Sequence, residues 1–495
     1  MNRHALGRIR RLSVKESRQC LSDRILGRVS EQVLGGNAPA ANDAGTVAKE
    51  GSRIRRCYQR RRLLTFLPRL RHGRRIYTIA GLLHQQQSWT IPIGIIVTSD
   101  FDIAVLGAGI SGLSFAHQAA RAGLQCLILE RASEPGGCIN TVRIPDGFWF
   151  ELGAHTLYNS YGSLLDIILA LGLKDRVQKR SKAPYRLWVD GKVRSVPSQL
   201  AMGELFVSAW RAFTEQKAGR TVEEYYRRLV GRGNWQRVFG PLLAAVPSQR
   251  ADTFPAEMLF KRRPRHKDFP RTFTFKGGLG SLVERLPRHD HITLRTNVEV
   301  QAITREGGLF AVQTTDSGRA LVRKVVLALP PSAGARLLAQ VAPEASAALG
   351  KVGFAEVTST GIVVKKRDCR FPRLAGLVPL DDKFFSVVTR DVVEDERFRG
   401  LAFHFRAGLS LDDRLDRIAA VTGTPRASFV HVAEHATSLP SPNRGHAEIV
   451  SALDAAIAYQ GIYVTGNFFS GLAIEDCALR SRAECDRLLR DLHRE

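Results

Sequence analysis

The sequence predicts an α/β fold in which parallel strands alternate with helices. One observation is an apolar, strand-like run, Ile103–Leu106, that leads into a glycine-rich turn and then into a helical pattern. Another is a second apolar run over 125–129 that ends in Glu130, about 20 residues after the turn. The 495 residues are 44% hydrophobic and 24% charged, as in globular proteins with a sizeable core. This composition excludes a fibrous or low-complexity protein.

The glycine-rich turn has the sequence Gly107-Ala108-Gly109-Ile110-Ser111-Gly112. Between a strand and a helix, and with a later acidic residue, this spacing is typical of a Rossmann-like dinucleotide-binding domain. Gly107 permits the tight turn, Gly109 lets a pyrophosphate approach the backbone, and Gly112 lets helix and strand pack closely. The helix N-terminus would bind the phosphates. The carboxylate of Glu130 would accept hydrogen bonds from ribose hydroxyls and would repel a 2′-phosphate, which disfavours NADP.

A second glycine pair, Gly136-Gly137, follows Glu130 and Arg131, and the segment Phe150-Glu151-Leu152-Gly153-Ala154-His155 comes next. This order resembles the extended signature of FAD-dependent proteins, in which the later segment returns beneath the isoalloxazine ring. Paired glycines suit it because the backbone has to pass close to the cofactor without a Cβ. The resemblance implies that Arg131, the glycine pair, Gly153 and Ala154 contact FAD. His155 either lines the flavin site or is a buried, hydrogen-bonded structural histidine.

The C-terminal segment repeats the pattern of a strand, a turn and a helix. The strand ends in Gly466 and Asn467, and apolar periodicity predicts a helix over 472–492. The residues expected to face the cofactor at its start are Gly471, Leu472, Ala473 and Ile474. A helix N-terminus offers N–H donors and a positive dipole. In the resembled proteins these groups face the pyrimidine edge of the flavin.

Together these segments resemble the FAD-dependent amine oxidase superfamily, and within it the protoporphyrinogen oxidase branch more than the amine oxidases. The resemblance extends from about residue 100 to the C-terminus. Middle segments in the family's order are the hairpin at 185–192, the helix capped by Thr221 and Glu224, the F-x-G-G step at 275–278, the strand at 297–303 and the strand at 325–329. The resemblance implies that Val300 meets the adenine. The spacing from Pro440 to Gly445-His446 favours the porphyrinogen oxidases.

The resemblance also implies a discontinuous fold. An FAD-binding, Rossmann-like domain of the glutathione-reductase type is expected over 100–165, 283–345 and 447–495. An α+β substrate domain is expected over 166–282 and 346–446. A small-molecule substrate would bind between them, as is common for such sites.

The implied activity is that of an FAD-dependent oxidoreductase, most like a protoporphyrinogen or coproporphyrinogen oxidase. Flavin would take a hydride from a reduced carbon and pass the electrons to oxygen or another acceptor. A flavin amine oxidase, a polyene desaturase and a sugar-nucleotide mutase-like enzyme are the alternatives. Arg186 falls where the family places an arginine that binds a substrate carboxylate, although an arginine exposed on the surface is the other interpretation. The sequence has no Ser/His/Asp, Cys/His or metal-ligand constellation, so it identifies no catalytic residue and predicts no metal.

Residues 1–99 form a basic extension, with 19 Lys and Arg against 5 Asp and Glu. The arginine runs at 53–56 and 60–62 could bind phosphate or anionic lipid, but we expect a disordered, solvated segment. A basic nucleic-acid-binding protein is the weakest alternative, and no nucleic-acid partner is expected. Alternatively, synthesis starts at Val97, where the composition changes, and the preceding residues are not translated. The intact mass of the natively expressed protein decides this point.

The seven cysteines contain no C-x-x-C pair, so a reducing compartment and a cytoplasmic location are expected. The apolar stretch before residue 97 is broken by His84-Gln85-Gln86-Gln87-Ser88 and is too short to span a bilayer. The Arg-rich start leaves an organelle transit peptide as a minor alternative. Peripheral contact with the inner membrane stays open because porphyrin-like substrates are apolar, although no clear amphipathic anchor stands out after residue 100.

Overall fold

The computed structural model describes residues 101–494. The predictions for the basic extension at 1–99 and for a start at Val97 therefore lie outside the described residues. Within the described part of the chain, no helix is both long and apolar enough to cross a membrane.

The first sheet is mainly parallel and has the strand order β10-β2-β1-β13-β12-β11, with β19 also paired to β13. Its strands are β1 (Phe101–Leu106), β2 (Cys126–Leu129), β10 (Ile292–Arg295), β11 (Val300–Glu306), β12 (Leu309–Thr314), β13 (Arg319–Leu327) and β19 (Ile462–Val464). The central strand β1 pairs in parallel with both β2 and β13. Its apolar run is buried on both faces, which explains why it does not alternate with polar residues.

Helices cover both faces of this sheet. One face carries α2 (Ile110–Arg121), α3 (Gly162–Ala170), α8 (Gly280–Arg285) and α13 (Ile474–Leu492). The other face carries α9 (Pro331–Leu338), α10 (Pro343–Gly350) and α12 (His446–Ala456). In the buried part of β1, Ile103 and Val105 pack in the first cluster and Ala104 and Leu106 in the second, as the alternation of a strand requires. This is the two-sided α/β arrangement that the sequence predicts.

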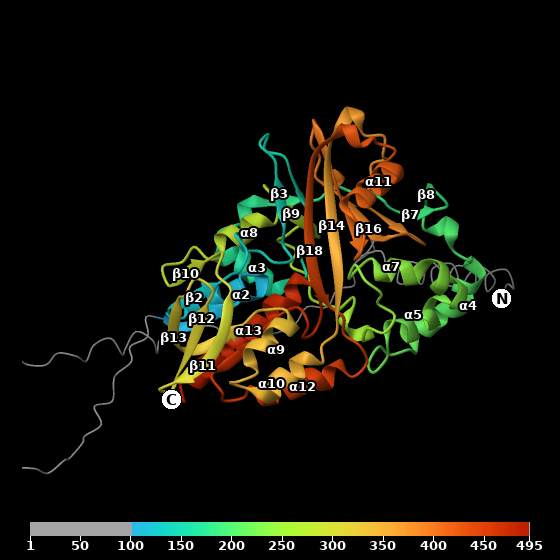
Figure 1. Ribbon diagram of the computed structural model, residues 1–495. Helices are drawn as coiled ribbons and strands as arrows, with labels where there is room; N and C mark the ends of the chain where they lie inside the picture. The colour runs from blue at the N-terminus through green and yellow to red at the C-terminus, as the bar shows by residue number, and fades with distance from the viewer. Residues whose placement is uncertain (1–100, 495) are drawn as a thin grey trace, which may run out of the picture. The chain divides into compact units, whose positions relative to one another are not determined.

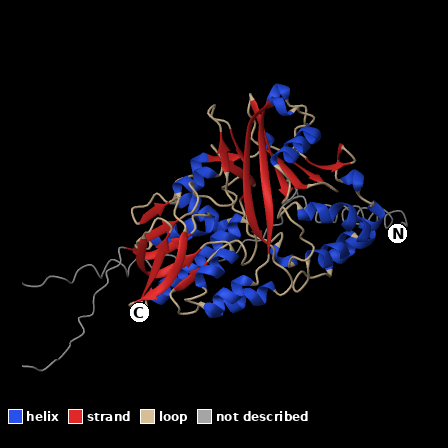
Figure 2. Ribbon diagram, in the orientation of Figure 1, coloured by secondary structure: helices blue, strands red, loops and turns tan. Residues whose placement is uncertain are grey.

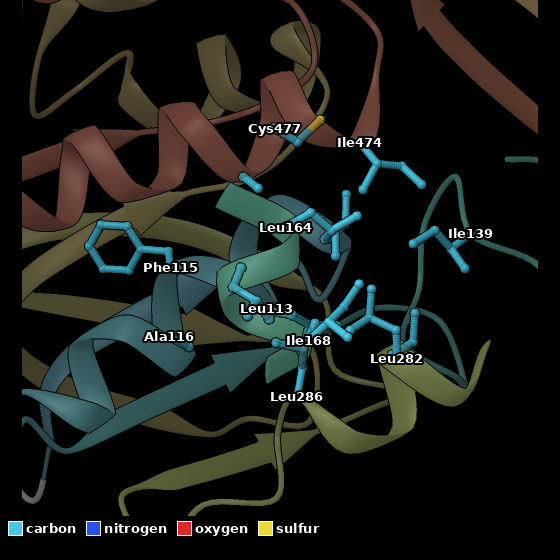
Figure 3. Close-up of a cluster of buried hydrophobic side chains, with 14 of the residues drawn as sticks. Leu113, Phe115, Ala116, Ile139, Leu164, Ile168, Leu282, Leu286, Ile474 and Cys477 are labelled. Carbon is cyan, nitrogen blue, oxygen red and sulfur yellow. The ribbon is translucent and has the colours of Figure 1, made fainter. Parts of the chain in front are cut away.

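The start of α13 is fixed against α3. Figure 3 shows Ile474 and Cys477 of α13 above Leu164 of α3 in the apolar cluster. The buried Glu475 carboxylate accepts hydrogen bonds from the backbone N–H groups of Ser163 and Leu164, both at 3.0 Å. These bonds satisfy two otherwise orphaned donors at the start of α3. The C-terminal segment is therefore joined to the N-terminal part of the chain.

The second sheet has the order β18-β14-β17-β16-β15-β7-β8 and is antiparallel except for the pair of β15 with β7. Its strands are β7 (Tyr185–Val189), β8 (Lys192–Arg194), β14 (Phe354–Lys365), β15 (Gly376–Pro379), β16 (Phe384–Thr389), β17 (Phe398–Arg406) and β18 (Phe429–Pro440). The two long strands β14 and β18 lie side by side (Figures 1 and 2). The helix α11 (Leu411–Thr422) packs on the face that contains Phe403 and Phe405.

A helical segment between β8 and β9 adds α4 (Met202–Ala209), α5 (Val222–Val230), α6 (Arg232–Asn234) and α7 (Gly240–Ala244). At the start of α5 the predicted capping box is present, since Glu224 N donates to Thr221 Oγ1 and Thr221 N donates to the Glu224 carboxylate. These helices share an apolar cluster with Leu187 and Val378 of the second sheet.

Two smaller sheets are built from short strands that lie between β2 and β10 in the sequence. One pairs β3 (Thr141–Arg143) with β4 (Trp149–Glu151), and the other has the order β5-β9-β6. Its strands are β5 (Leu157–Tyr158), β6 (Val177–Lys179) and β9 (Thr272–Phe275). The strand β4 packs against the second sheet through Phe150, which shares an apolar cluster with Val363 and Ala402.

Candidate functional site

The predicted glycine-rich turn lies between β1 and α2. A Cβ on Gly107, whose φ is +98°, would lie 2.6 Å from the carbonyl oxygen of Ala328. A Cβ on Gly112 would overlap the carbonyl oxygen of Gly107. The nearest atom to a Cβ on Gly109 is instead 4.0 Å away. The fold itself therefore requires Gly107 and Gly112, whereas Gly109 leaves space for a group from outside.

Glu130 links the glycine-rich turn to the segment that precedes β11. Its carboxylate accepts hydrogen bonds from Ala108 N at 2.7 Å and from Ala132 N at 2.9 Å. Its carbonyl oxygen accepts from Val298 N at 2.9 Å, two residues before Val300. Arg131 is exposed beside it. The acidic residue and the strand expected to meet adenine are thus neighbours.

The second glycine pair lies against the same turn. Gly136 N donates to Ala108 O at 2.9 Å, and Gly136 forms a parallel bridge with Gly109. No side chain caps the N-terminus of α2 among the described residues, so its first N–H groups remain available. An open glycine, uncapped N–H groups and a nearby carboxylate suit the pyrophosphate and ribose of a dinucleotide.

A cavity of about 320 Å³ opens beyond this turn. Residues predicted to contact the cofactor that line it are Gly153, Ala154, His155, Asn467, Leu472, Ala473 and Ile474. Cys138 also lines it and directly follows the second glycine pair. The structure therefore brings the expected N-terminal and C-terminal segments to one place.

The opposite wall of the cavity comes from one end of the second sheet. Its residues include Tyr185, Val357, Ser359, His404, Thr437 and Leu439. Farther along the same face, Gly361 and Gly400 contact β4. A Cβ on Gly361 would overlap the ring of Phe150, and one on Gly400 would lie 2.7 Å from Phe150 Cβ. These two glycines let β4 lie against the sheet, which places His155 near His404.

The cavity contains two neutral histidines. Burial, with smaller effects of Arg180 and His404, lowers the pKa of His155 to about 3. Burial lowers the pKa of His404 to about 4. Nδ1 of His155 lies 3.3 Å from Gly153 O, and Nδ1 of His404 lies 2.8 Å from Ser359 Oγ. Both rings are therefore uncharged at neutral pH. Each can form a hydrogen bond with a ligand or accept a proton from it.

The charged side chains of the cavity form one cluster. Asp476 Oδ1 accepts from Lys261 Nζ at 2.9 Å and from Arg263 Nη2 at 2.6 Å. Lys261 also donates to Ser470 O. The side chains of Asp476 and Arg263 are 4% and 12% exposed. Among the described residues that line the cavity, two cations thus face one carboxylate.

Four further predicted residues do not line the cavity. Gly466 precedes Asn467, and Gly471 lies so close to Asp476 that a Cβ there would overlap the Asp476 carboxylate. Val300 lies near Glu130, as described above. Arg186 follows Tyr185 on β7, and because strand residues alternate between faces, its side chain lies on the face opposite Tyr185. The assignment of Arg186 to a substrate carboxylate stays a prediction.

The Pro440–His446 element joins the two walls. Gln249 Nε2 donates to Pro440 O at 2.9 Å, and Gly445 begins α12 with a φ of +85°. The buried ring of His446 then contacts Phe468 O through Nε2. Phe468 directly follows Asn467, so this element fixes one of the turns that border the cavity.

Sequence reasoning missed the residues of the second wall. Ser359 and His404 are 45 residues apart, and Lys261 and Asp476 are 215 apart. One local signal was present: His404 stands between Phe403 and Phe405, so strand alternation turns it away from the apolar face. For Lys261 and Arg263 the sequence offered no comparable pattern.

Comparisons with known proteins agree with this geometry. The family model described as flavin containing amine oxidoreductase matches residues 110–453. Coproporphyrinogen III oxidase of Bacillus subtilis (strain 168) is 21% identical over 77% of this chain and 96% of its own length. A 15-cis-phytoene desaturase of Synechococcus elongatus is 35% identical, but the match spans only 16% of this chain and 17% of the desaturase.

A solved structure shows the same fold. It is that of a protein from Exiguobacterium sp. 255-15 provisionally named a protoporphyrinogen oxidase, with a TM-score of 0.65 and 19% identity. The match covers 80% of this chain and 99% of that protein. The expected resemblance to the FAD-dependent amine oxidase superfamily is confirmed, and the match to coproporphyrinogen III oxidase over most of both chains agrees with a resemblance to the porphyrinogen oxidase branch. The chain belongs to the flavin-containing amine oxidoreductase family and is an FAD-dependent oxidoreductase.

Proposed function

We propose that this enzyme oxidises a porphyrinogen, a reduced cyclic tetrapyrrole that carries carboxylates. The observation that carries the proposal is the composition of the cavity. Its walls are largely apolar and aromatic. The two positive charges of Lys261 and Arg263 outnumber the single negative charge of Asp476. An apolar ring with anionic substituents matches such a cavity.

We propose the following arrangement of FAD. The adenosine half would lie near Glu130 and Val300, the pyrophosphate at the N-terminus of α2, and the isoalloxazine ring between Gly153–His155 and Asn467–Ile474. The elements of the first sheet would form the FAD-binding domain at 100–165, 283–345 and 447–495. The elements of the second sheet would form the substrate domain at 166–282 and 346–446.

When bound, FAD supplies the acceptor for a hydride from the substrate. The chain itself orients and encloses the substrate. Lys261 and Arg263 are held by Asp476, so their donors are pre-positioned for a carboxylate of the substrate. The neutral rings of His155 and His404 border the reacting region without adding charge. Six electrons leave a porphyrinogen during its conversion to a porphyrin, so three turnovers with oxygen or another acceptor are required.

The charge of the cavity also ranks the alternatives. An amine oxidase acts on a substrate that is cationic before it reacts, and Lys261 and Arg263 would repel that cation. The carboxylate that could attract it, Asp476, is already paired with both. A polyene desaturase would have no use for the cations. A sugar-nucleotide mutase would use them, and is therefore the second candidate.

The test is a direct assay of the yellow holoenzyme. Protoporphyrinogen and coproporphyrinogen are added separately, and porphyrin fluorescence is followed beside a flavin-stripped sample that measures autoxidation. A flavin-dependent rise supports the proposal and identifies the preferred ring. Absence of that rise, in a protein whose flavin an amine, a polyene or a sugar nucleotide can engage, refutes it.

We further propose a peripheral contact with a membrane, through which an apolar substrate would be delivered. The supporting feature is α4 with the residue that follows it, where Met202, Phe206, Val207 and Trp210 are 57%, 59%, 67% and 58% exposed. Three of them recur at i, i+4 and i+8, on one side of the helix. This surface was not evident from the sequence.

A further inference from the structure

A cross-strand pair on the second sheet places a histidine and a serine together in the cavity. Ser359 of β14 and His404 of β17 are direct partners in the antiparallel register. Both are 6% exposed, both line the cavity, and Ser359 Oγ lies 2.8 Å from His404 Nδ1. Directly opposite residues on one face of such a pair are the closest side-chain neighbours that a sheet offers.

The register fixes which faces these residues occupy. On β14, Ser359 and Gly361 share a face, and on β17 His404 shares that face with Ala402 and Gly400. The glycines and Ala402 contact β4, so only the end of the face beyond them is open to the cavity. The next residues of β17, Phe403 and Phe405, are fully buried on the other side. The register of the sheet therefore holds the His404 side chain on the cavity face.

The geometry points to His404 as the catalytic residue that accepts the proton lost by the substrate during oxidation, with Ser359 as its positioning residue. If Nδ1 of His404 carries the hydrogen and donates it to Ser359 Oγ, the lone pair of Nε2 is left for the cavity. The serine thus selects the tautomer that can act as a base.

Because this role presupposes oxidation of a porphyrinogen, the step can be balanced. A C–H bond of a bridging methylene breaks and its hydrogen leaves as hydride, with both electrons, to the FAD of the enzyme. The positive charge that develops on the substrate spreads to a pyrrole nitrogen. In the same step the N–H bond there breaks, its electron pair stays on nitrogen, and the proton moves to Nε2 of His404, so the proton acceptor assists the departure of the hydride. Solvent takes that proton before the next hydride leaves.

The surroundings of His404 suit a transient proton acceptor. The titratable and charged groups that line the cavity beside His404 are Cys138, His155, Tyr158, Tyr161, Tyr185, Lys261, Arg263 and Asp476, and Arg180 lies next to His155. Burial keeps His404 neutral down to a pKa of about 4, so the ring is ready to accept a proton at neutral pH and releases it readily afterwards. A weak base suffices because the pyrrole N–H becomes strongly acidic as the hydride leaves.

The test compares variants of the full-length holoenzyme in anaerobic single turnovers. His404→Gln cannot accept the proton, and flavin reduction by the porphyrinogen is expected to slow by about 100-fold or more. Ser359→Ala is expected to slow it by about 3- to 10-fold, and Ser359→Thr, which restores a hydroxyl, should recover the rate. His431→Asn, on the neighbouring strand β18 but outside the cavity lining, is the matched control and should leave the rate unchanged.

Two readouts distinguish proton transfer from a structural role. The rate in His404→Gln should rise with pH, because solvent hydroxide must then take the proton, while the wild-type rate is flat above about pH 6. Independently of turnover, ¹⁵N NMR of the imidazole, assigned by its loss in His404→Gln, should show the hydrogen on Nδ1. A hydrogen on Nε2, or a wild-type rate in His404→Gln, overturns the inference. If no porphyrinogen reduces the wild-type flavin, the proposed substrate is wrong, and the NMR tautomer still decides whether His404 can act as a base.

Discussion

The two sheets border the cavity with different kinds of groups. The elements around the first sheet offer mainly backbone: the glycine turn and uncapped N–H groups at α2 lie next to the cavity, and the turns at Gly153, which follows β4, and at Asn467 line it. The second sheet offers side chains in alternate positions, such as Ser359, His404 and Thr437. A backbone site is suited to a constant partner, whereas side chains can change one at a time. We infer that cofactor binding and substrate choice are separable in this molecule.

The largest expected effect separates two glycines of the same turn. Gly112→Ala should destabilise the whole fold by at least about 1–3 kcal/mol, because its Cβ overlaps the backbone of Gly107. Gly109→Ala should leave the stability of the apoprotein within about 0.5 kcal/mol, because its Cβ meets no atom closer than 4.0 Å, yet it should abolish FAD binding. Urea unfolding of the apoprotein and FAD titration measure the two effects. Equal loss of stability in both variants would contradict the distinction.

A smaller effect is expected on the side-chain wall. Lys261→Met should raise KM about 10- to 100-fold for a porphyrinogen with free carboxylates, because a charged hydrogen bond is lost. It should leave KM unchanged for the methyl ester of the same ring. The neighbouring Arg262 is exposed and does not line the cavity, so Arg262→Met is the control. An equal rise in KM for acid and ester would show that Lys261 acts only on the shape of the cavity.

The first sheet also carries a pH-sensitive group away from the site. Neither ring nitrogen of His117, in α2, has a hydrogen-bond partner among the described residues. Burial, then Arg121 and His289, lower its pKa to about 4. The unfolded chain therefore binds a proton more readily, and stability falls as pH decreases from about 6.5 to 4. His117→Leu should flatten that decrease and stabilise the protein by about 1–3 kcal/mol at pH 5, and less at pH 8.

Chemical denaturation at the two pH values, with FAD content as a check on the site, measures the effect of His117→Leu. A variant that is less stable at pH 5 than the wild type would show that the buried ring is not the source of the acid sensitivity.

The smallest effect concerns α4, which belongs to neither wall. Trp210→Ser with Phe206→Ser should weaken binding to anionic phospholipid vesicles several-fold and leave turnover of a dispersed substrate unchanged. Sedimentation with vesicles measures this, and Tyr459→Ser, at an 80% exposed site elsewhere, is the control. Equal binding of both variants would exclude α4 as the contact.

The backbone wall could be predicted from the sequence better than the side-chain wall. The turn at Gly107, Glu130, the capping box at Thr221 and the helix before Leu492 were predictable because each depends on neighbours within about 20 residues. The hairpin of β7 and β8 was also predictable, and its turn residues Asp190 and Gly191 both have positive φ. Such features are determined by residues close together in the sequence.

The residues of the second wall were not predictable, because the strand register decides which side chains face the cavity. Whether His404 faces the cavity or the cluster around Phe403 depends on the pairing of β17 with β14, which a single sequence does not state. The pairing of Asp476 with Lys261 and Arg263 depends on the path of the chain between them. Arg186 illustrates the same limit, since the sequence does not state which of two neighbours on β7 faces the cavity, and it is Tyr185 that lines it.

The glycines at 361 and 400 have a consequence for reaction distance. Hydride transfer requires reacting atoms about 3–3.5 Å apart, and an error of 1 Å can cost about 100-fold in rate. In the arrangement proposed above, β4 and the second sheet would lie on either side of cofactor and substrate, and Phe150 touches the sheet where Gly361 and Gly400 lack side chains. The absence of a Cβ at these two positions would thus determine how closely the reacting groups approach. Residues that never touch the substrate can in this way set the speed of its oxidation.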